Sequence, residues 1–440
     1  MLLNYRFSNF RSFHDETSIS MFAGLQRTLN ENLIKKNGNR ILPSALIYGA
    51  NASGKSNIIM SLAVMKEIVL AGSLESNNPD LNNLEFYPFA HDGNNNPMLF
   101  EVEFTNNNQH MIYNFEIQCT PFKKEERKII SENLFVIKNR NEKIKIFERN
   151  KENVSIMRDK KSLDLIKFDI KLLDAIEKKI NKNLDYSELF LSRAFKSIIS
   201  NDLAELVIDF FRNKLVVVSD FTLKKTNLTF SVEDMPEKNF ILWNRILDGF
   251  VKNADFGPQN IAFKSNKLNN DGMANMEIVS IYKHKDENIM IPSEIMESRG
   301  TLKLLDFAIP FEKIFTSGGT FVLDEFDAAI HPELIKGIIS LFNDQDINTN
   351  GAQLIFTTHN PIYLNYKMFR RDQIKFVEKD KDTFISVIYS LADFGSEEVR
   401  NDHNYLINYF KGNYGALPFI DFSRLLKDND GKQEEIHGLI

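Results

Sequence analysis

The amino-acid sequence predicts an α/β fold: a mixed sheet with flanking helices, split by a long insertion of strands and helices. Three observations predict it. The apolar run at 45–48 leads into a glycine-rich loop and then a helix-like segment. Two further apolar runs, at 320–323 and 352–356, end in acidic or polar residues. The stretch at 121–285 changes from a strand-like pattern to a helical one and back, which indicates an inserted part of the chain.

The composition is typical of a folded globular protein. The chain has 440 residues, of which 43% are hydrophobic and 11% aromatic, enough for two or three domains with sizeable cores. Its net charge of −6 gives no general attraction to nucleic acid. The charge is uneven, because residues 121–200 hold 20 Lys and Arg against 13 Asp and Glu. This basic stretch is compatible with DNA or an acidic partner, and also with a solvated helical surface.

Nothing in the sequence directs the chain to a membrane or to an oxidising compartment. No run of about twenty apolar residues occurs, and the first residues lack a signal peptide's charged-then-apolar order. Cys119 is the single cysteine, and no cluster of His and Cys has the spacing of a zinc site. We therefore expect a cytoplasmic protein that makes no membrane contact.

The expected elements and domains follow the chain in a simple order. The patterns predict strands at 2–7 and 17–22, a strand, loop and helix at 44–72, a hairpin at 98–118, strands at 129–137 and 143–148, helices across 162–254 and a strand at 276–284. The expected domains are an N-terminal lobe at 1–120, an inserted strand and helical domain at 121–285, and a C-terminal lobe at 286–440.

The loop "GANASGKS" (49–56) has the residues needed to hold a polyphosphate. Gly49 and Gly54 let the backbone curl, so that successive N–H groups point into one concavity at the N-terminus of a helix, where the helix dipole favours an anion. Lys55 can reach the β- and γ-phosphates of a nucleotide, and the Ser56 hydroxyl can bind Mg²⁺. The residues expected to bind ATP are Gly49, Asn51, Ala52, Ser53, Gly54, Lys55, Ser56 and Asn57.

Two strands of the second half could complete this site. "TFVLDEFD" (320–327) would deliver Asp324 beside the Mg²⁺ and Glu325 to the γ-phosphate, where a carboxylate can polarise an attacking water. "AQLIFTTHNP" (352–361) would place His359 at the end of another strand, able to donate a hydrogen bond to the γ-phosphate.

A third segment, "ESRGTLKLL" (297–305), precedes an amphipathic helix. Ser298 either belongs to a phosphate-binding helix N-terminus or only caps the helix. Each segment alone is a weak signal, and their order along the chain is what predicts the site.

That order resembles the ABC-type ATPase heads of the RecF, Rad50 and SMC kind, and "FSNFRSF" (7–13) resembles their opening strand and turn. More closely, the chain resembles the AAA15 or OLD-like ATPases of bacterial phage-defence and abortive-infection operons, among them the RloA/AbiL type, the PARIS ATPase and the Septu ATPase. The resembling segments lie within 1–120 and 290–421, and the middle matches only in outline. The resemblance implies an ABC-type ATPase head.

The resemblance also implies a role for each matching residue. Lys55 and Ser56 would bind phosphate and Mg²⁺, and Asp324 would help to hold the metal. Glu325 would position the hydrolytic water, and His359 would sense the γ-phosphate.

Other matching residues imply an ATP-sandwiched homodimer or a higher oligomer. Ser298 and Gly300 would belong to a signature motif that caps ATP bound by the opposite subunit, and Asp327 to the loop that crosses the same interface. Arg11 would touch the nucleotide. The chain departs from the pattern after the first helix, where Gln109 and Gln118 are weak candidates for the usual metal-linked glutamine.

Two functions stay open from the sequence. The first is a sensor or regulator ATPase of an anti-phage, abortive-infection system that controls an effector from a neighbouring gene, such as a Toprim-like or HNH nuclease. The alternative is a RecF-like DNA-repair ATPase that acts on DNA ends or gaps. A nucleotide-bound scaffold is disfavoured, because it has no need of Glu325.

No intrinsic nuclease is expected. Too few residues follow His359 for a Toprim domain, and the acids in "VEKDKDTF" (377–384) are typical of a polar hairpin turn. DNA or a DNA-mimic protein stays open as a ligand of the basic insertion.

Overall fold

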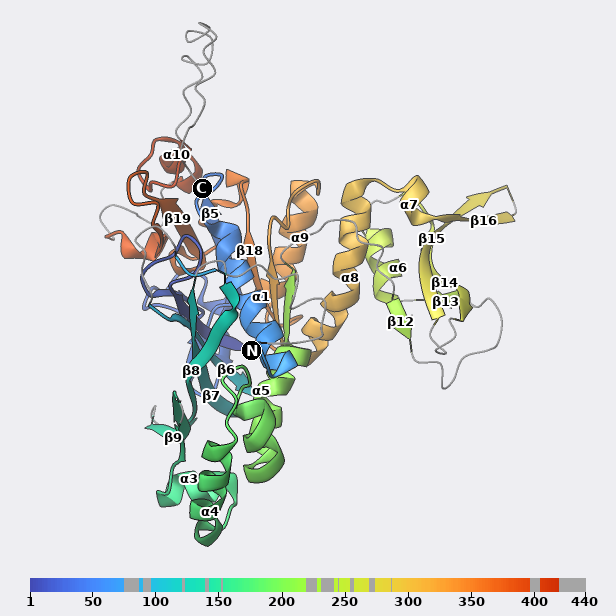
Figure 1. The fold of residues 1–440 in the computed structure, drawn as a ribbon. Coiled ribbons are helices and arrows are strands. Elements are labelled where there is room, and N and C mark those ends of the chain that lie inside the picture. Colours follow the sequence, from blue (N-terminus) through green and yellow to red (C-terminus); the bar gives the residue numbers. More distant parts are fainter. Residues whose placement is uncertain are drawn as a thin grey trace, which may run out of the picture.

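In the part of the chain that the structure describes, the strands form three larger β-sheets, shown in Figure 1, and one two-stranded sheet. A computed structural model describes residues 1–74, 87–89, 96–120, 123–138, 142–151, 153–218, 228–230, 241–243, 245–253, 257–268, 274–285, 287–395 and 404–418. Parts of the two resembling regions, 1–120 and 290–421, lie outside the described residues, among them 75–86, 90–95 and 419–421.

The central sheet has six strands and carries the glycine-rich loop. Its order is β11 (Leu215–Val218), β17 (Thr320–Leu323), β18 (Gln353–Thr357), β5 (Ser44–Gly49), β19 (Ile374–Lys379) and β20 (Ser386–Ser390). The first five strands are parallel, and β20 is antiparallel to β19. The carboxyl ends of the parallel strands therefore meet at one edge, which is where α/β proteins bind ligands.

Both faces of this sheet are covered, so all six residues of β5 are buried. Ala45 and Ile47 face the core that includes α1 (Lys55–Ala71). Leu46 and Tyr48 face the other core, which lies under α8 (Arg299–Ser317) and α9 (Pro332–Asn343).

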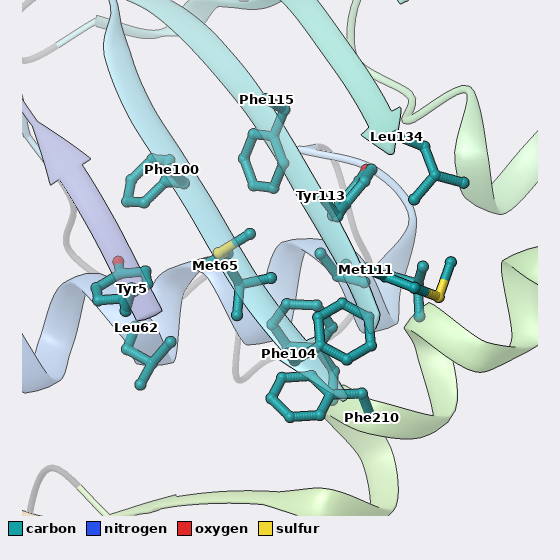
Figure 2. Close-up of a cluster of buried hydrophobic side chains, with 14 of the residues drawn as sticks. Tyr5, Leu62, Met65, Phe100, Phe104, Met111, Tyr113, Phe115, Leu134 and Phe210 are labelled. Carbon is teal, nitrogen blue, oxygen red and sulfur yellow. The ribbon is translucent and has the colours of Figure 1, made fainter. Parts of the chain in front are cut away.

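A second sheet packs on the opposite side of α1. Its seven antiparallel strands, in order, are β10 (Asn153–Ile156), β9 (Glu142–Asn150), β8 (Lys123–Lys138), β7 (Gln109–Thr120), β6 (Met98–Asn106), β1 (Leu2–Ser8) and β2 (Thr17–Ser20). Figure 2 shows Leu62 and Met65 of α1 against the strands that carry Tyr5 and Phe104. Because two sheets enclose α1, most of its residues are buried, including Ser61, which accepts a hydrogen bond from the Tyr5 hydroxyl at 3.0 Å.

The third sheet lies beyond α8, on the right of Figure 1. Its strands are β12 (Leu228–Phe230), β13 (Ile241–Trp243), β14 (Asn260–Leu268), β15 (Ala274–His284) and β16 (Glu287–Pro292). The other described elements are η1 (Asn30–Asn32), β3 (Ile34–Lys36), β4 (Asn39–Ile41), α3 (Lys160–Ile166), α4 (Ile170–Lys182), η3 (Leu191–Ile199), α5 (Asn201–Asp209), η4 (Phe210–Lys214), α6 (Arg245–Asn253), α7 (Ser293–Met296), η5 (Pro361–Tyr363), η6 (Arg371–Gln373), η7 (Leu391–Asp393) and α10 (Tyr405–Phe410).

The predicted mixed α/β fold is confirmed, as are the strand, loop and helix at 44–72 and the hairpin at 98–118. The helical prediction for 162–254 is right for α3 to α6 and wrong at β11, β12 and β13. β11 is a run of four apolar residues, and periodicity cannot distinguish so short a run from one helical turn.

The predicted domain limits do not coincide with the sheets. The limit at 120 falls between β7 and β8, which are antiparallel neighbours in one sheet. β11 belongs to the central sheet, although its residues lie inside the predicted insertion. The three-part division therefore stays a prediction, and the sheet order favours an insertion that begins after β11.

Two properties of the described chain bear on its surroundings. Among its helices, none combines the length and the apolar character that crossing a bilayer requires. Cys119 is buried, and burial raises the pKa of its thiol to about 12, so the thiol stays protonated at neutral pH.

Candidate nucleotide-binding site

The glycine-rich loop has a shape that depends on two glycines. A Cβ at Gly49, the last residue of β5, would lie 2.4 Å from the Val377 carbonyl oxygen. Gly54 precedes α1 with a φ of +112°, in the left-handed region, and exposed Ala52 has a φ of 62°. Left-handed residues in such loops allow successive N–H groups to line an anion-binding concavity.

Lys55 lies inside this loop. Its Nζ donates hydrogen bonds to the carbonyl oxygens of Gly49 and Ala50, both at 2.9 Å. Burial lowers the pKa of Lys55 to about 8, against the opposing pull of the Asp324 and Glu325 carboxylates. The ammonium is therefore held between the loop and the acidic end of β17, next to the expected position of a phosphate.

A buried network of hydroxyl groups fixes the second half of the loop. The Oγ atom of Ser386 lies 2.6 Å from the Ser53 carbonyl oxygen and 2.8 Å from Ser12 Oγ. Ser12 Oγ in turn accepts a hydrogen bond from Asn57 Nδ2 at 2.8 Å. The loop is thus tied to the turn after β1 and to the first residue of β20.

Arg11 reaches the first turn of α1 from the turn after β1. Its backbone has a φ of 50°, and its Nη1 lies 3.4 Å from Asn57 Oδ1, to which it donates. Ser56, the neighbour of Asn57, is exposed. The guanidinium therefore lies beside the residues expected to hold the nucleotide.

The acidic end of β17 is organised by Thr357 at the end of β18. Thr357 Oγ1 donates to Asp324 Oδ1 at 2.5 Å and accepts from the Glu325 N–H at 2.7 Å. The Asp324 N–H donates to the Val218 carbonyl oxygen of β11 at 2.9 Å. Neighbouring strands on both sides thus fix the carboxylate of Asp324 at the edge of the sheet.

Glu325 and His359 form a pair at the same edge. The distance between Glu325 Oε1 and His359 Nε2 is 3.5 Å, and the two side chains are 55% and 41% exposed. Glu325 has a φ of 45°, which is uncommon for a residue other than glycine and indicates that surrounding contacts hold it there. The pair faces solvent, where a phosphate and a water could reach it.

Asp327 is bound within its own chain. Thr358 Oγ1 donates to Asp327 Oδ2 at 2.7 Å. Burial raises the pKa of Asp327, and the hydrogen bond from Thr358 opposes that rise. Its carboxylate therefore links the loop after β17 to the segment that carries His359.

Ser298 caps α8. Its Oγ accepts a hydrogen bond from the Thr301 N–H at 3.1 Å. This is the helix cap that the sequence offered as the alternative to phosphate binding. Gly300 is needed for packing, because a Cβ there would lie 2.2 Å from the Ala329 carbonyl oxygen. The cap does not exclude a phosphate, since other N–H groups of a first turn lack partners within the helix.

Sequence reasoning assigned no role to four residues of this region: Ser12, Lys303, Thr357 and Ser386. Ser12 and Thr357 lie inside the quoted motifs, so a closer look at their hydroxyl groups could have found them. Lys303 also lies inside a quoted motif, "ESRGTLKLL", but its contact with the Glu325 carbonyl oxygen depends on the fold, as does the contact of Ser386 with Ser53, and no spacing indicates either. Gln109, at the start of β7, and Gln118, near its end, do not lie in the glycine-rich loop or in the loops after β17 and β18.

The residues at this edge suit ATP with Mg²⁺. The loop offers a concave backbone and one ammonium group, and Ser56 and Asp324 offer a hydroxyl and a carboxylate. Mg²⁺ in phosphoryl-transfer sites is held by one or two such protein oxygens together with substrate phosphates. Among the described residues, no group of three or more His, Cys, Asp or Glu could hold a metal.

The fold is a mixed α/β fold, in which the glycine-rich loop between β5 and α1 has the sequence and arrangement typical of a phosphate-binding loop. Residues 44–365 match the family AAA_21, which is described as "AAA domain, putative AbiEii toxin, Type IV TA system". The match covers more than half of the chain, and the chain belongs to this family. No match was found among curated proteins.

Three solved structures are similar to the chain over 88% of its length. An SMC head bound to the C-terminal winged-helix domain of ScpA has 15% identity, a TM-score of 0.41 and 97% of its own chain covered. The SMC head domain from Thermotoga maritima has 15% identity, a TM-score of 0.36 and 98% covered. The SMC head with an extended coiled coil, bound to the C-terminal domain of ScpA from Pyrococcus furiosus, has 14% identity, a TM-score of 0.39 and 96% covered.

Proposed function

We propose that the protein is a Mg²⁺-dependent ATPase that regulates a separately encoded effector in an anti-phage, abortive-infection system. The observation that carries the ATPase part is the pairing of Glu325 with His359 at 3.5 Å, beside the carboxylate of Asp324. The family description, which names a toxin and a type IV toxin–antitoxin system, supports the regulatory part.

In this proposal the protein's own groups bind the phosphates and orient the water. The Lys55 ammonium exchanges the carbonyls of Gly49 and Ala50 for β- and γ-phosphate oxygens. Ser56 and Asp324 would hold Mg²⁺, and the bound ion would neutralise phosphate charge.

The hydrolytic step uses the pair at the sheet edge. Glu325 accepts a hydrogen bond from the attacking water and polarises it, as a general base does. His359 donates from its ring to the γ-phosphate, and its position beside Glu325 supports both roles. Thr357 keeps Asp324 and the Glu325 backbone in place during the step.

We propose further that two chains share each ATP. Ser298 and Gly300 would bring the N-terminus of α8 to the nucleotide of a second chain. Arg11 lies beside Asn57 of its own chain and would touch the nucleotide held there. Support comes from the exposure of Ser298 and from the unpaired N–H groups of a helical first turn. Asp327 contributes through the backbone of its loop, because its carboxylate is bound to Thr358.

The proposed setting is the cytoplasm, and the proposed partner is the product of an adjacent gene, a Toprim-like or HNH nuclease. The test is to express the gene alone and with its neighbours, and to challenge each strain with a panel of phages. We expect protection only from the combination, and only with Lys55 intact. Protection or toxicity from this gene alone would contradict a separate effector. ATPase activity stimulated by gapped DNA, without any defence phenotype, would favour the RecF-like alternative.

A further inference from the structure

The helix α8 lies directly on the loop that carries Glu325. Gly300 approaches the Ala329 carbonyl so closely that no Cβ fits between them. Phe307, two turns further along the helix, packs on Phe326 with ring centroids 4.7 Å apart. Residues spaced in this way share one face of a helix, so one face of α8 covers the loop at 325–329.

Lys303 lies on that same face, between Gly300 and Phe307. Only 8% of the residue is exposed. Its Nζ donates to the Glu325 carbonyl oxygen at 2.5 Å and lies 3.3 Å from the Ala328 carbonyl oxygen. Burial lowers the pKa of Lys303, and the nearby carboxylates of Asp327, Glu325 and Asp324 oppose that shift.

The loop under Lys303 is in a backbone conformation that needs support. Glu325 has a φ of 45° and Ala329 a φ of 66°, both in the left-handed region that residues with a Cβ adopt at a cost. The Glu325 carbonyl oxygen accepts from the Ala328 N–H at 3.1 Å as well as from Lys303. The Lys303 ammonium therefore donates a hydrogen bond to the backbone of Glu325, the residue whose carboxylate has to be oriented for hydrolysis.

We propose that Lys303 is a positioning residue that orients the Glu325 carboxylate. Through Lys303, binding of a second chain's nucleotide at the N-terminus of α8 changes the orientation of Glu325. The inference rests on the proposed role of Glu325. Any shift of α8 at Ser298 moves Lys303 by way of a rigid helix, and Lys303 pulls on the backbone of Glu325. Each chain would then hydrolyse its own ATP only when its α8 is engaged by the other chain.

The test compares Lys303→Met with Lys313→Met in the full-length protein. Lys313 lies on the same helix, and its Nζ contacts Asn213 Oδ1 at an exposed site, so it is a matched control. Lys303→Met should lower kcat between about tenfold and a hundredfold, because a small misplacement of a catalytic group has an effect of this size. The Kd for ATP should stay unchanged, and turnover should no longer respond to engagement of α8 by a second chain. Lys303→Arg, which keeps the charge and the donors, should recover part of the rate, while Lys313→Met should match the wild type.

A second comparison separates positioning from folding. If Lys303 acts through Glu325, adding Lys303→Met to Glu325→Gln should slow hydrolysis no further. Independent, multiplying effects would overturn the inference, as would a wild-type kcat per ATP-binding molecule in Lys303→Met. Wild-type hydrolysis by Glu325→Gln alone would instead contradict the proposed function, so the two failures are distinguishable.

Discussion

The N-termini of α1 and α8 are both expected to meet phosphate, and they are built differently. At α1, Lys55 is buried inside the loop, and the hydroxyls of Ser12, in the turn after β1, and Ser386, in β20, fix the loop. At α8, Ser298 and Arg299 are exposed, and the preceding Ile295 and Met296 are 73% and 50% exposed. The first end is organised within one chain, whereas the second leaves polar and apolar groups open to solvent. The difference supports the proposal that α1 binds a nucleotide within one chain and that a second chain completes the contacts of α8.

The largest expected effect is the loss of ATP binding at the N-terminus of α1. Lys55→Ala should abolish ATP binding, because it removes the ammonium that lies in the loop and bonds Gly49 and Ala50. Equilibrium binding of a fluorescent ATP analogue measures this loss.

Ser298→Arg should bind ATP normally and hydrolyse it poorly, since the substitution blocks the surface of α8 that is offered to the other chain and leaves the α1 loop intact.

Mixing these two variants sharpens the comparison. A heterodimer of Lys55→Ala and Ser298→Arg chains keeps one site with both halves intact, and should recover part of the ATPase activity. No recovery, in a mixture shown to exchange subunits, would argue against a shared site and leave Ser298 as a helix cap worth about 1 kcal/mol.

The next effect concerns hydrolysis alone. Glu325→Gln should keep ATP binding and slow hydrolysis by about a hundredfold or more, the scale expected for loss of a general base. It should also trap the ATP-bound dimer, which size-exclusion chromatography with light scattering would detect. Hydrolysis at the wild-type rate would show that Glu325 does not act on the water.

The two ends also differ in how far the sequence could predict them. The loop at 49–56 is a local motif, because a strand, two glycines and a lysine in sequence are enough to form it. The expectation that Glu325 and His359 both meet the γ-phosphate followed from the order of the motifs along the chain, whereas their contact at 3.5 Å depends on the pairing of β17 with β18 in the folded sheet.

The contacts that support these groups could not be predicted. Ser386 comes from a strand more than three hundred residues after the loop, and only the folded sheet brings its hydroxyl to Ser53. Lys303 has the spacing of any helical lysine, and its role depends on the left-handed turn at Glu325. Local periodicity also missed β11, because tertiary pairing with β17 decides the structure of a four-residue apolar run.

The third effect is a pH dependence at the α1 end. Burial lowers the pKa of Lys55 to about 8, so Lys55 is protonated below that pH and loses its charge as the pH rises through it. Bound phosphates favour the charged form and raise the pKa in the complex, so binding takes up a proton above pH 8. ATP affinity should therefore be flat below pH 8 and fall by up to about tenfold per pH unit above it. Titration with a non-hydrolysable analogue between pH 7 and pH 9.5 tests this, and a flat profile would contradict the pKa of Lys55.

The smallest effect tests whether the network around the loop makes the α1 end self-sufficient. Ser386 is a residue of which only 2% is exposed, and Ser386→Ala leaves the Ser53 carbonyl oxygen without that contact in a buried position. Such a loss costs about 1–3 kcal/mol of unfolding free energy. Because the network holds the loop in its binding shape, ATP affinity should also fall by a few-fold, roughly 1 kcal/mol. Urea denaturation and analogue binding measure the two quantities.

The matched control is Ser340→Ala. The Ser340 hydroxyl donates to the Lys336 carbonyl oxygen on the exposed face of α9, so its loss should change neither the unfolding free energy nor the ATP affinity measurably. If Ser386→Ala were as stable as this control and bound ATP as tightly, the loop would keep its shape without the network. The contrast between the α1 and α8 ends would then rest on Lys55 alone.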